Sequence, residues 1–257
     1  MSLFDWIIKL TTEYWQQFLN GTLNTLIMAL TGTIAGFVIG LLIAVIRTIP
    51  VEPNDNIFKK SALKTVSFIL SAYVEIVRGT PMLVQALIVH YSLFVKLGMS
   101  PIVSAIIIIS FNTGAYMAEI ARGGIMSIDK GQVEGAHAIG MSHFQTMFHV
   151  ILPQAIKNIM PSIGNEFVVN IKDSSVLSVI SITELMFISK QAGGTYAKFV
   201  PAYIICAIIY FILTFTVTRL LRLIEKKMAG GSTYTICGSQ SDPNAEIRIK
   251  EEQKEWH

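Results

Sequence analysis

Charged side chains are scarce in this sequence. Asp, Glu, Lys and Arg make up 14% of the 257 residues, whereas apolar residue types make up 52%, and the mean hydropathy is +0.56. A soluble chain of this length carries a far more charged surface, so the composition indicates an all-α polytopic membrane protein that contacts the lipid bilayer. The net charge of +3 comes mostly from segments that flank apolar runs, which indicates membrane orientation and no nucleic-acid partner.

Signatures of catalysis and of metal binding are missing as well. The chain has no G-x-x-x-x-G-K-[ST] phosphate loop, no G-x-S-x-G and no H-E-x-x-H, so we expect no enzyme activity and no ATP hydrolysis by this chain itself. Its two cysteines, Cys206 and Cys237, show no metal-binding spacing, and we expect neither a cofactor nor a metal. Asp5, Lys9 and Glu13 interrupt the place where a cleavable signal peptide would have its apolar core.

Five segments are predicted as membrane spans because they are long and largely apolar. Residues 62–77 are interpreted as a lead-in helix before a break at Gly79–Pro81, and Lys157 and Glu166 interrupt the fourth span. In residues 1–19, apolar and polar residues alternate at helical spacing, which predicts an amphipathic helix at the membrane interface. The five spans lie near residues 22–46, 79–96, 101–119, 151–170 and 198–219.

The distribution of Lys and Arg predicts the orientation of these spans. An outside N-terminus and a cytoplasmic C-terminus put the basic residues of 47–64 and 219–227 in the cytoplasm, together with the polar segment 129–153. Residues 228–257 are polar and are expected to form a flexible cytoplasmic tail. The transmembrane domain is therefore expected to cover residues 20–227.

A ridge of small residues marks the first span. Gly32, Gly36 and Gly40 recur at intervals of four, and such a ridge lets helices pack closely in lipid. The alternative is that membrane spans merely tolerate glycine, and we favour packing.

Segment 129–153 is the most specific stretch of the chain. Asp129 is a plausible N-cap with Gln132 three residues on, which is a capping-box spacing. Val133, Ala136, His137 and Gly140 then fall on one small-residue face of a short helix. Pro153 is placed to begin a further helix. The alternative is an ordinary surface helix between two spans.

The spacing of this segment resembles the E-A-A-x3-G-x9-I-x-L-P loop of ABC importer permeases. The matching positions in this sequence are Glu134, Gly135, Ala136, Gly140, Leu152 and Pro153. Gly135 stands in place of the first Ala and Val150 in place of Ile, and Gly135 costs roughly 0.5–1 kcal/mol of helix stability relative to Ala. Further stretches are similar to the polar amino acid permeases of the ABC superfamily, over about residues 20–225. These stretches are 78–85, 115–125, 130–132, 152–155 and 172–175.

The resemblance implies a type I importer permease with five spans in the cell membrane of a prokaryote. In that family the loop docks on cytoplasmic ATPase subunits that bind the ATP, so the residues matched above are expected to couple ATPase closure to alternating access. A second permease chain, an extracytoplasmic binding protein and a polar amino acid substrate are the other implied partners. An ion-coupled secondary transporter is the alternative, although the two halves of the chain show no convincing similarity.

Polar residues within the predicted spans are candidates for a substrate pathway, because such residues are costly in lipid and tend to face a bundle interior. Four of them recur on one face of the fourth span, and two lie in the second and third spans. This polar stripe has two interpretations, which we favour equally: it lines a substrate pathway, or it forms interhelical hydrogen bonds or ion pairs. The six residues are Gln85, Asn112, Ser162, Glu166, Asn170 and Asp173.

Overall fold

The computed structural model describes residues 1–51 and 56–228, and all regular elements within them are helical. Residues 229–257, where a cytoplasmic tail is expected, lie outside the described residues. The π-helices are η1 and η2, η3 is a 3-10 helix, and the others are α-helices. In order they are α1 (Leu3–Arg47), α2 (Ile57–Gly79), α3 (Met82–Val89), η1 (His90–Phe94), α4 (Pro101–Met126), α5 (Lys130–Ala138), α6 (His143–Thr146), η2 (Met147–Ile151), α7 (Leu152–Asp173), η3 (Ser174–Ile180), α8 (Leu185–Thr195) and α9 (Phe199–Met228).

Helix α1 is a single helix of 45 residues, where the sequence analysis expected an interfacial helix followed by a separate span. Its start is fixed by a capping box between Ser2 and Asp5. Leu10 and Phe18 are buried in one cluster with residues of α8 and α9, so the apolar face of the first turns packs on protein. At 1.5 Å per residue the helix is roughly twice as long as the hydrocarbon core is thick, and it therefore extends well beyond it.

Helices α1 and α4 pack closely through the glycine ridge, as predicted. A Cβ atom added to Gly32 would lie 2.3 Å from Cγ2 of Ile109, and one added to Gly40 would lie 2.4 Å from Cβ of Met117. Gly36 faces Thr113 in the same way, at 2.7 Å from its Cβ. The alternative of merely tolerated glycine is wrong at these positions, because no larger residue fits without moving the helices apart.

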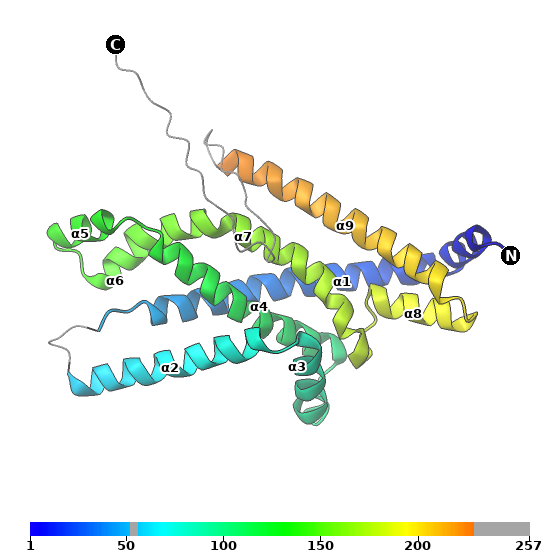
Figure 1. The fold of residues 1–257 in the computed structure, drawn as a ribbon, viewed down its shortest axis with the longest axis horizontal. Coiled ribbons are helices and arrows are strands. Elements are labelled where there is room, and N and C mark those ends of the chain that lie inside the picture. Colours follow the sequence, from blue (N-terminus) through cyan, green and yellow to red (C-terminus); the bar gives the residue numbers. More distant parts are fainter. Residues whose placement is uncertain (52–55, 229–257) are drawn as a thin grey trace, which may run out of the picture.

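Among the described residues, three helices are long and apolar enough to cross a membrane: α1, α4 and α9. A fourth span is possible by length and composition if α2 and the pair α3–η1 count as one broken span. The predicted break is present, since α2 ends at Gly79 and α3 begins at Met82. Its geometry differs from the expectation, because α3–η1 leaves α2 at 110° and stands out from the bundle, whereas α2 runs alongside it (Figure 1).

The two ends of the bundle carry different elements. The N-terminus and α8 lie at one end, and α5 and α6 lie at the other (Figure 1). At the first end the hydroxyl of Tyr196 donates to the carboxylate of Glu13 at 2.8 and 2.9 Å, and this contact raises the pKa of Tyr196. Lys9 lies 4.1 Å from the centroid of the same tyrosine ring. These contacts anchor the first turns of α1 on the connection between α8 and α9.

Candidate functional site

Helix α5 is a short, well-capped helix at one end of the bundle. The carboxylate of Asp129 accepts a hydrogen bond from the backbone N–H of Gly131 at 2.6 Å, which confirms the predicted N-cap. Gln132 does not form the expected capping box with Asp129. A capping box is found instead at the start of α6, where Ser142 and Gln145 exchange both bonds.

Gly140 ends α5 in a Schellman motif. Its φ is +85°, its N–H donates to the carbonyl of His137, and the N–H of Met141 donates to the carbonyl of Ala136, both at 3.0 Å. This pair of bonds defines the motif, and only glycine adopts the required left-handed backbone without strain. The glycine is therefore needed to reverse the chain between α5 and α6.

Only part of the α5 face that the spacing suggested is exposed. Ala136 is only 5% exposed and Val133 packs against the neighbouring apolar cluster, so both face the rest of this chain. Glu134 and Gly135 are exposed, and no atom of the described residues lies within 4 Å of a Cβ placed on Gly135. His137 and Gly140 of the predicted face are exposed as well, so the exposed surface combines half of that face with Glu134 and Gly135.

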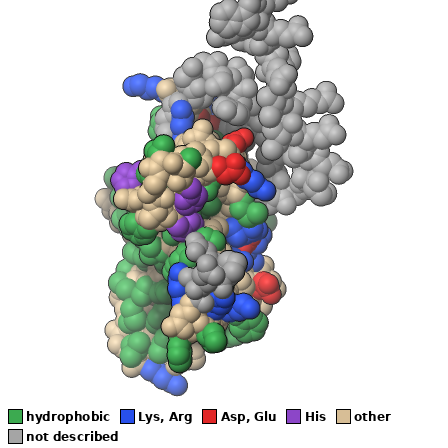
Figure 2. Space-filling model, turned by 90° about the vertical axis from the view of Figure 1, so that its left-hand side faces the viewer, with side chains coloured by type: hydrophobic (Ala, Val, Ile, Leu, Met, Phe, Trp, Pro, Cys, Tyr) green, Lys and Arg blue, Asp and Glu red, His purple; other side chains and the backbone are tan. Residues whose placement is uncertain are grey.

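Two apolar side chains project at the tip between α5 and η2. Ile139 is 79% exposed and Phe144 is 68% exposed. Figure 2, which looks at this end, shows apolar side chains and histidines together with several Lys and Arg side chains. Sequence reasoning missed both residues, although an Ile directly before the helix-ending glycine is a signal that could have found the first. Exposed apolar side chains on a small protrusion are typical of a docking surface.

The tip is attached rigidly to the bundle. Helix α7 begins at Leu152, which is buried, and Pro153 lies exposed in its first turn as predicted. Leu152 belongs to an apolar cluster that joins η2 and the first turns of α7 to α1 and α4. A displacement of the tip must therefore move these three long helices or break this cluster.

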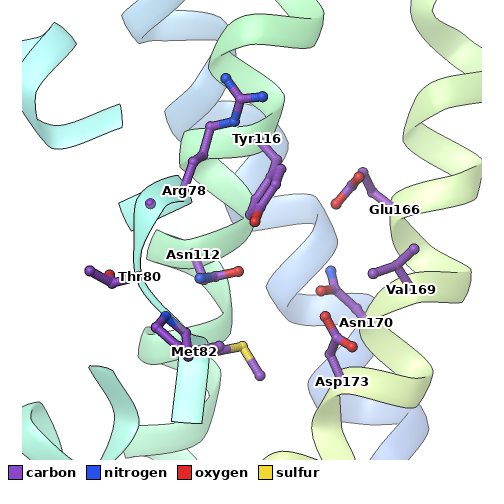
Figure 3. A pocket seen from close by; sticks show the side chains of 11 residues that line it. Arg78, Thr80, Met82, Asn112, Tyr116, Glu166, Val169, Asn170 and Asp173 are labelled. Atoms are coloured by element: carbon purple, nitrogen blue, oxygen red, sulfur yellow. The ribbon is translucent and has the colours of Figure 1, made fainter. Parts of the chain in front are cut away.

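A pocket of about 370 Å³ lies where the break between α2 and α3 faces α4 and α7. Figure 3 shows its polar side chains converging from these elements. Arg78 comes from the end of α2, Asn112 and Tyr116 come from α4, and Asn170 and Asp173 come from α7. The remaining lining residues are Gly79, Thr80, Pro81, Met82, Glu166 and Val169.

One wall of the pocket is cationic and the opposite wall is anionic. The guanidinium of Arg78 lies 5.4 Å from the centroid of the Tyr116 ring, and Figure 3 shows Arg78 and Glu166 on opposite sides of this tyrosine. Glu166 is 5% exposed, and Asp173 lies two turns along the same helix. The pocket thus offers one cation and two carboxylates to a ligand.

Four of the six predicted pathway residues line this pocket: Asn112, Glu166, Asn170 and Asp173. Asn170 also forms interhelical hydrogen bonds, as the alternative interpretation predicted. Its amide oxygen accepts from the hydroxyl of Thr113 at 3.0 Å, and its amide nitrogen donates to the hydroxyl of Thr33 at 2.8 Å. The stripe on α7 therefore serves both packing and the pocket.

The other two predicted residues lie outside the pocket lining. Gln85 holds the break in place, since its amide nitrogen donates to the carbonyl of Val77 at 2.8 Å and to the hydroxyl of Thr80 at 2.7 Å. Its amide oxygen accepts from Asn112 at 3.1 Å. Ser162 is on α7 one turn before Glu166 but does not reach the cavity.

Arg78, Thr80 and Tyr116 were missed as pocket residues. An arginine at the end of a span usually forms an ion pair or snorkels to the interface, so its charge alone does not single out Arg78. The signal that could have found it is the break at Gly79–Pro81, because a broken helix at membrane depth exposes backbone groups that commonly line a cavity.

An ion-pair cluster joins α1 to α4 near the end that carries α5. The guanidinium of Arg47 donates to Oε1 of Glu119 at 2.5 Å, and that of Arg122 donates to Oε2 of the same residue at 2.8 and 3.0 Å. The three side chains are partly buried. The cluster fixes the register of the two helices that carry the glycine ridge.

Comparison with known proteins identifies the family. A family model described as "binding-protein-dependent transport system inner membrane component" matches residues 60–230. The chain belongs to this family. The segment with the E-A-A-like spacing, the break after α2 and the pocket all lie within the matched range.

Curated relatives narrow the resemblance. The L-cystine transport system permease protein TcyB of Bacillus subtilis is 36% identical over 199 residues, which cover 76% of this chain and 81% of that protein. The glutamine transport system permease protein GlnP of Escherichia coli K12 is 33% identical over 213 residues, which cover 82% of this chain and 92% of that protein. These relatives confirm the predicted similarity to permeases of amino acid ABC importers.

Solved structures agree with this assignment. A chain from the crystal structure of an amino acid ABC transporter with histidines is 35% identical and superposes with a TM-score of 0.73, covering 84% of this chain and 96% of that chain. A chain of the MetNI methionine ABC transporter in an inward-facing conformation superposes with a TM-score of 0.65 at 21% identity, which shows the shared fold.

Proposed function

We propose that this chain is the permease subunit of an ATP-driven importer of amino acids, with cytoplasmic ATPase subunits docked on the tip around α5. A second permease chain and an extracytoplasmic binding protein complete the proposed assembly. Family membership, the names of the relatives and the exposed tip support the proposal. The observation that carries it is the pair Ile139 and Phe144, exposed on a capped protrusion that is rigidly tied to the bundle.

The proposed coupling is mechanical. Closure of the ATPase would displace the tip as a rigid lever, and the apolar cluster at η2 and the start of α7 would carry that displacement to α1, α4 and α7. Helices α4 and α7 form two walls of the pocket, whereas the break at Gly79–Pro81 forms the third. Relative movement of these walls would open the pocket alternately to the two sides of the membrane.

The pocket is the proposed place where the substrate passes. A zwitterionic amino acid carries a carboxylate, which suits Arg78, and an ammonium group, which suits Glu166 and Asp173. The volume of about 370 Å³ lies within the range of about 300–1,000 Å³ that is usual for small-ligand sites. The amide groups of Asn112 and Asn170 add hydrogen-bonding capacity for a polar side chain.

Affinity purification of the full chain from its native membrane tests the coupling proposal. A soluble subunit with a phosphate-loop motif should co-purify with the wild type, and Ile139→Glu should abolish its recovery. Ile57→Glu is the matched control, because Ile57 is 80% exposed and a carboxylate is favourable at the start of α2. Equal recovery with both variants would refute docking at this tip, and recovery of the chain alone would refute the importer.

Amino acid uptake by cells that depend on this system tests the pocket. Glu166→Gln should raise KM by about tenfold or more, because the loss of one ion pair to a desolvated ligand costs on the order of 1.5–3 kcal/mol. Ser162→Ala is the control, since Ser162 lies on the same helix one turn from the cavity. Unchanged uptake and unchanged substrate preference in Glu166→Gln would show that this carboxylate has no role in the pathway.

A further inference from the structure

A second cavity of about 370 Å³ lies between α7 and α9. Its wall on α7 is formed by Val168 and Lys172, which point away from the face of that helix that lines the amino acid pocket. Its wall on α9 is one helical face with a spacing of three and four residues. This face consists of Phe211, Thr214, Phe215, Thr218, Arg219 and Arg222.

The groove is lined by three cations, and no carboxylate is among its lining residues in the described part of the chain. The cations are Lys172, Arg219 and Arg222. Asp173 interacts electrostatically with Lys172, but it lines the other pocket. Neither arginine forms an ion pair with a carboxylate in the part of the chain that the structure describes. Arg219 instead lies 5.0 Å from the ring centroid of Phe215. Three positive charges around one small cavity repel one another unless an anion lies between them.

The side-chain directions bring the cations toward a common place. Helices α7 and α9 run in opposite directions, as Figure 1 shows, and helical side chains lean toward the N-terminus of their own helix. The side chain of Lys172 on α7 and that of Arg222 on α9 therefore point along the groove in opposite directions, and both point toward Arg219. The hydroxyls of Thr214 and Thr218 donate to the carbonyls one turn back, at 2.8 and 2.7 Å, which leaves the three cations as the donors for a ligand.

The groove opens on the apolar outer face of a membrane-spanning helix. Helix α9 is among the helices apolar enough to cross a membrane, and Phe211 and Phe215 are 66% and 49% exposed. The two arginines lie toward the end of α9 that carries Lys226 and Lys227. A ligand here meets charge at one end of the groove and apolar surface at the other, which matches the build of a phospholipid.

We propose that this groove binds the phosphate headgroup of an anionic phospholipid, with its acyl chains along the aromatic part of α9. Basic pockets between membrane helices near the cytoplasmic side bind anionic headgroups in this way. The proposal rests on the orientation predicted from the distribution of Lys and Arg, in which this end of α9 is cytoplasmic. It depends on neither the ATPase nor the substrate, so it is tested separately from the importer function.

Native mass spectrometry of the purified full chain, titrated with phosphatidylglycerol or phosphatidylcholine of the same chain length, tests the proposal. The wild type should bind phosphatidylglycerol at least about tenfold more tightly. Each Lys or Arg that contacts the headgroup is expected to strengthen binding by about fivefold, so Arg219→Gln with Arg222→Gln should weaken binding roughly 20- to 30-fold, whereas exposed charges outside the groove should contribute much less. The pair Lys226→Gln and Lys227→Gln is the matched control, because it removes two exposed charges from the same helix outside the groove.

Further variants and one competitor distinguish the lipid from a soluble phosphate ester and from a second copy of the chain. Arg219→Lys with Arg222→Lys should retain most of the preference, and Lys172→Gln should weaken binding about fivefold from the other wall. Equal losses in the control pair, or no preference of the wild type for phosphatidylglycerol, would overturn the proposal. Competition by soluble sn-glycerol 3-phosphate as strong as by the lipid would show a site for a phosphate ester instead. A change in the ratio of monomer to dimer with unchanged lipid binding would show that a second copy covers the groove.

Discussion

Replacement of Gly40 by alanine is the sharpest test of the packing between α1 and α4. The added Cβ atom would lie 2.4 Å from Cβ of Met117 and 2.7 Å from the backbone nitrogen of Ala118. Carbon atoms in contact are separated by about 3.5–4.0 Å, so the two helices must move apart locally by about 1 Å. Since part of the obstacle is backbone, a change of rotamer on α4 cannot relieve it.

The expected cost of Gly40→Ala is about 1–3 kcal/mol, the usual range for overpacking. In a domain of this size that corresponds to a fall of the unfolding temperature by roughly 2–12 °C. Gly123→Ala is the matched control, because within the described part of the chain no atom lies within 4 Å of a Cβ at that position of α4. It should leave stability unchanged or raise it by up to about 1 kcal/mol through helix propensity.

Thermal unfolding in detergent, followed by far-ultraviolet circular dichroism, measures both variants. The same chemical change should therefore lower stability at Gly40 and not at Gly123. Equal unfolding temperatures for Gly40→Ala, Gly123→Ala and the wild type would refute the claim that the glycine ridge sets the distance between α1 and α4.

Two further predictions concern the ion-pair cluster and the coupling segment. Glu119→Gln should lower stability by roughly 1–3 kcal/mol in the same unfolding assay, because it leaves the partly buried guanidinium of Arg47 without a carboxylate; an unchanged transition would show that the cluster carries no stability. Gly140→Ala should impose about 1–2 kcal/mol of backbone strain at a φ of +85° and should therefore speed amide hydrogen exchange around the turn. Gly135→Ala should instead slow exchange in α5, because alanine favours the helix more than glycine. Equal exchange rates in both variants would show that the Schellman turn does not constrain this segment.

Local patterns in the sequence predicted much of the site. The interval of four from Gly32 through Gly36 to Gly40 predicted close helix packing, although not that α4 is the partner, and the polar stripe that includes Glu166 predicted one wall of the pocket. The pair Gly79–Pro81 predicted a break, because proline restricts the residue before it and removes a backbone donor. Each of these features depends on a few neighbouring residues, which is why one sequence sufficed.

Features that depend on distant segments could not be predicted in this way. Helix α1 continues through residue 21 because its first turns pack on α8 and α9. No local sequence pattern predicts that contact. The bend of 110° after α2 is set by hydrogen bonds that Gln85 makes and by contacts with α4. The burial of Ala136 on α5 was not predicted, because a small residue fits equally well against a partner and against the chain's own apolar cluster.

Amino acid uptake into proteoliposomes tests the central claim most directly. The vesicles contain this chain with the ATPase that co-purifies with it, and the extracytoplasmic binding protein is added with the labelled amino acid. We predict uptake that requires ATP, that stops with Ile139→Glu and that persists with Ile57→Glu. Uptake by this chain alone, without ATP and driven by an imposed ion gradient, would contradict the account.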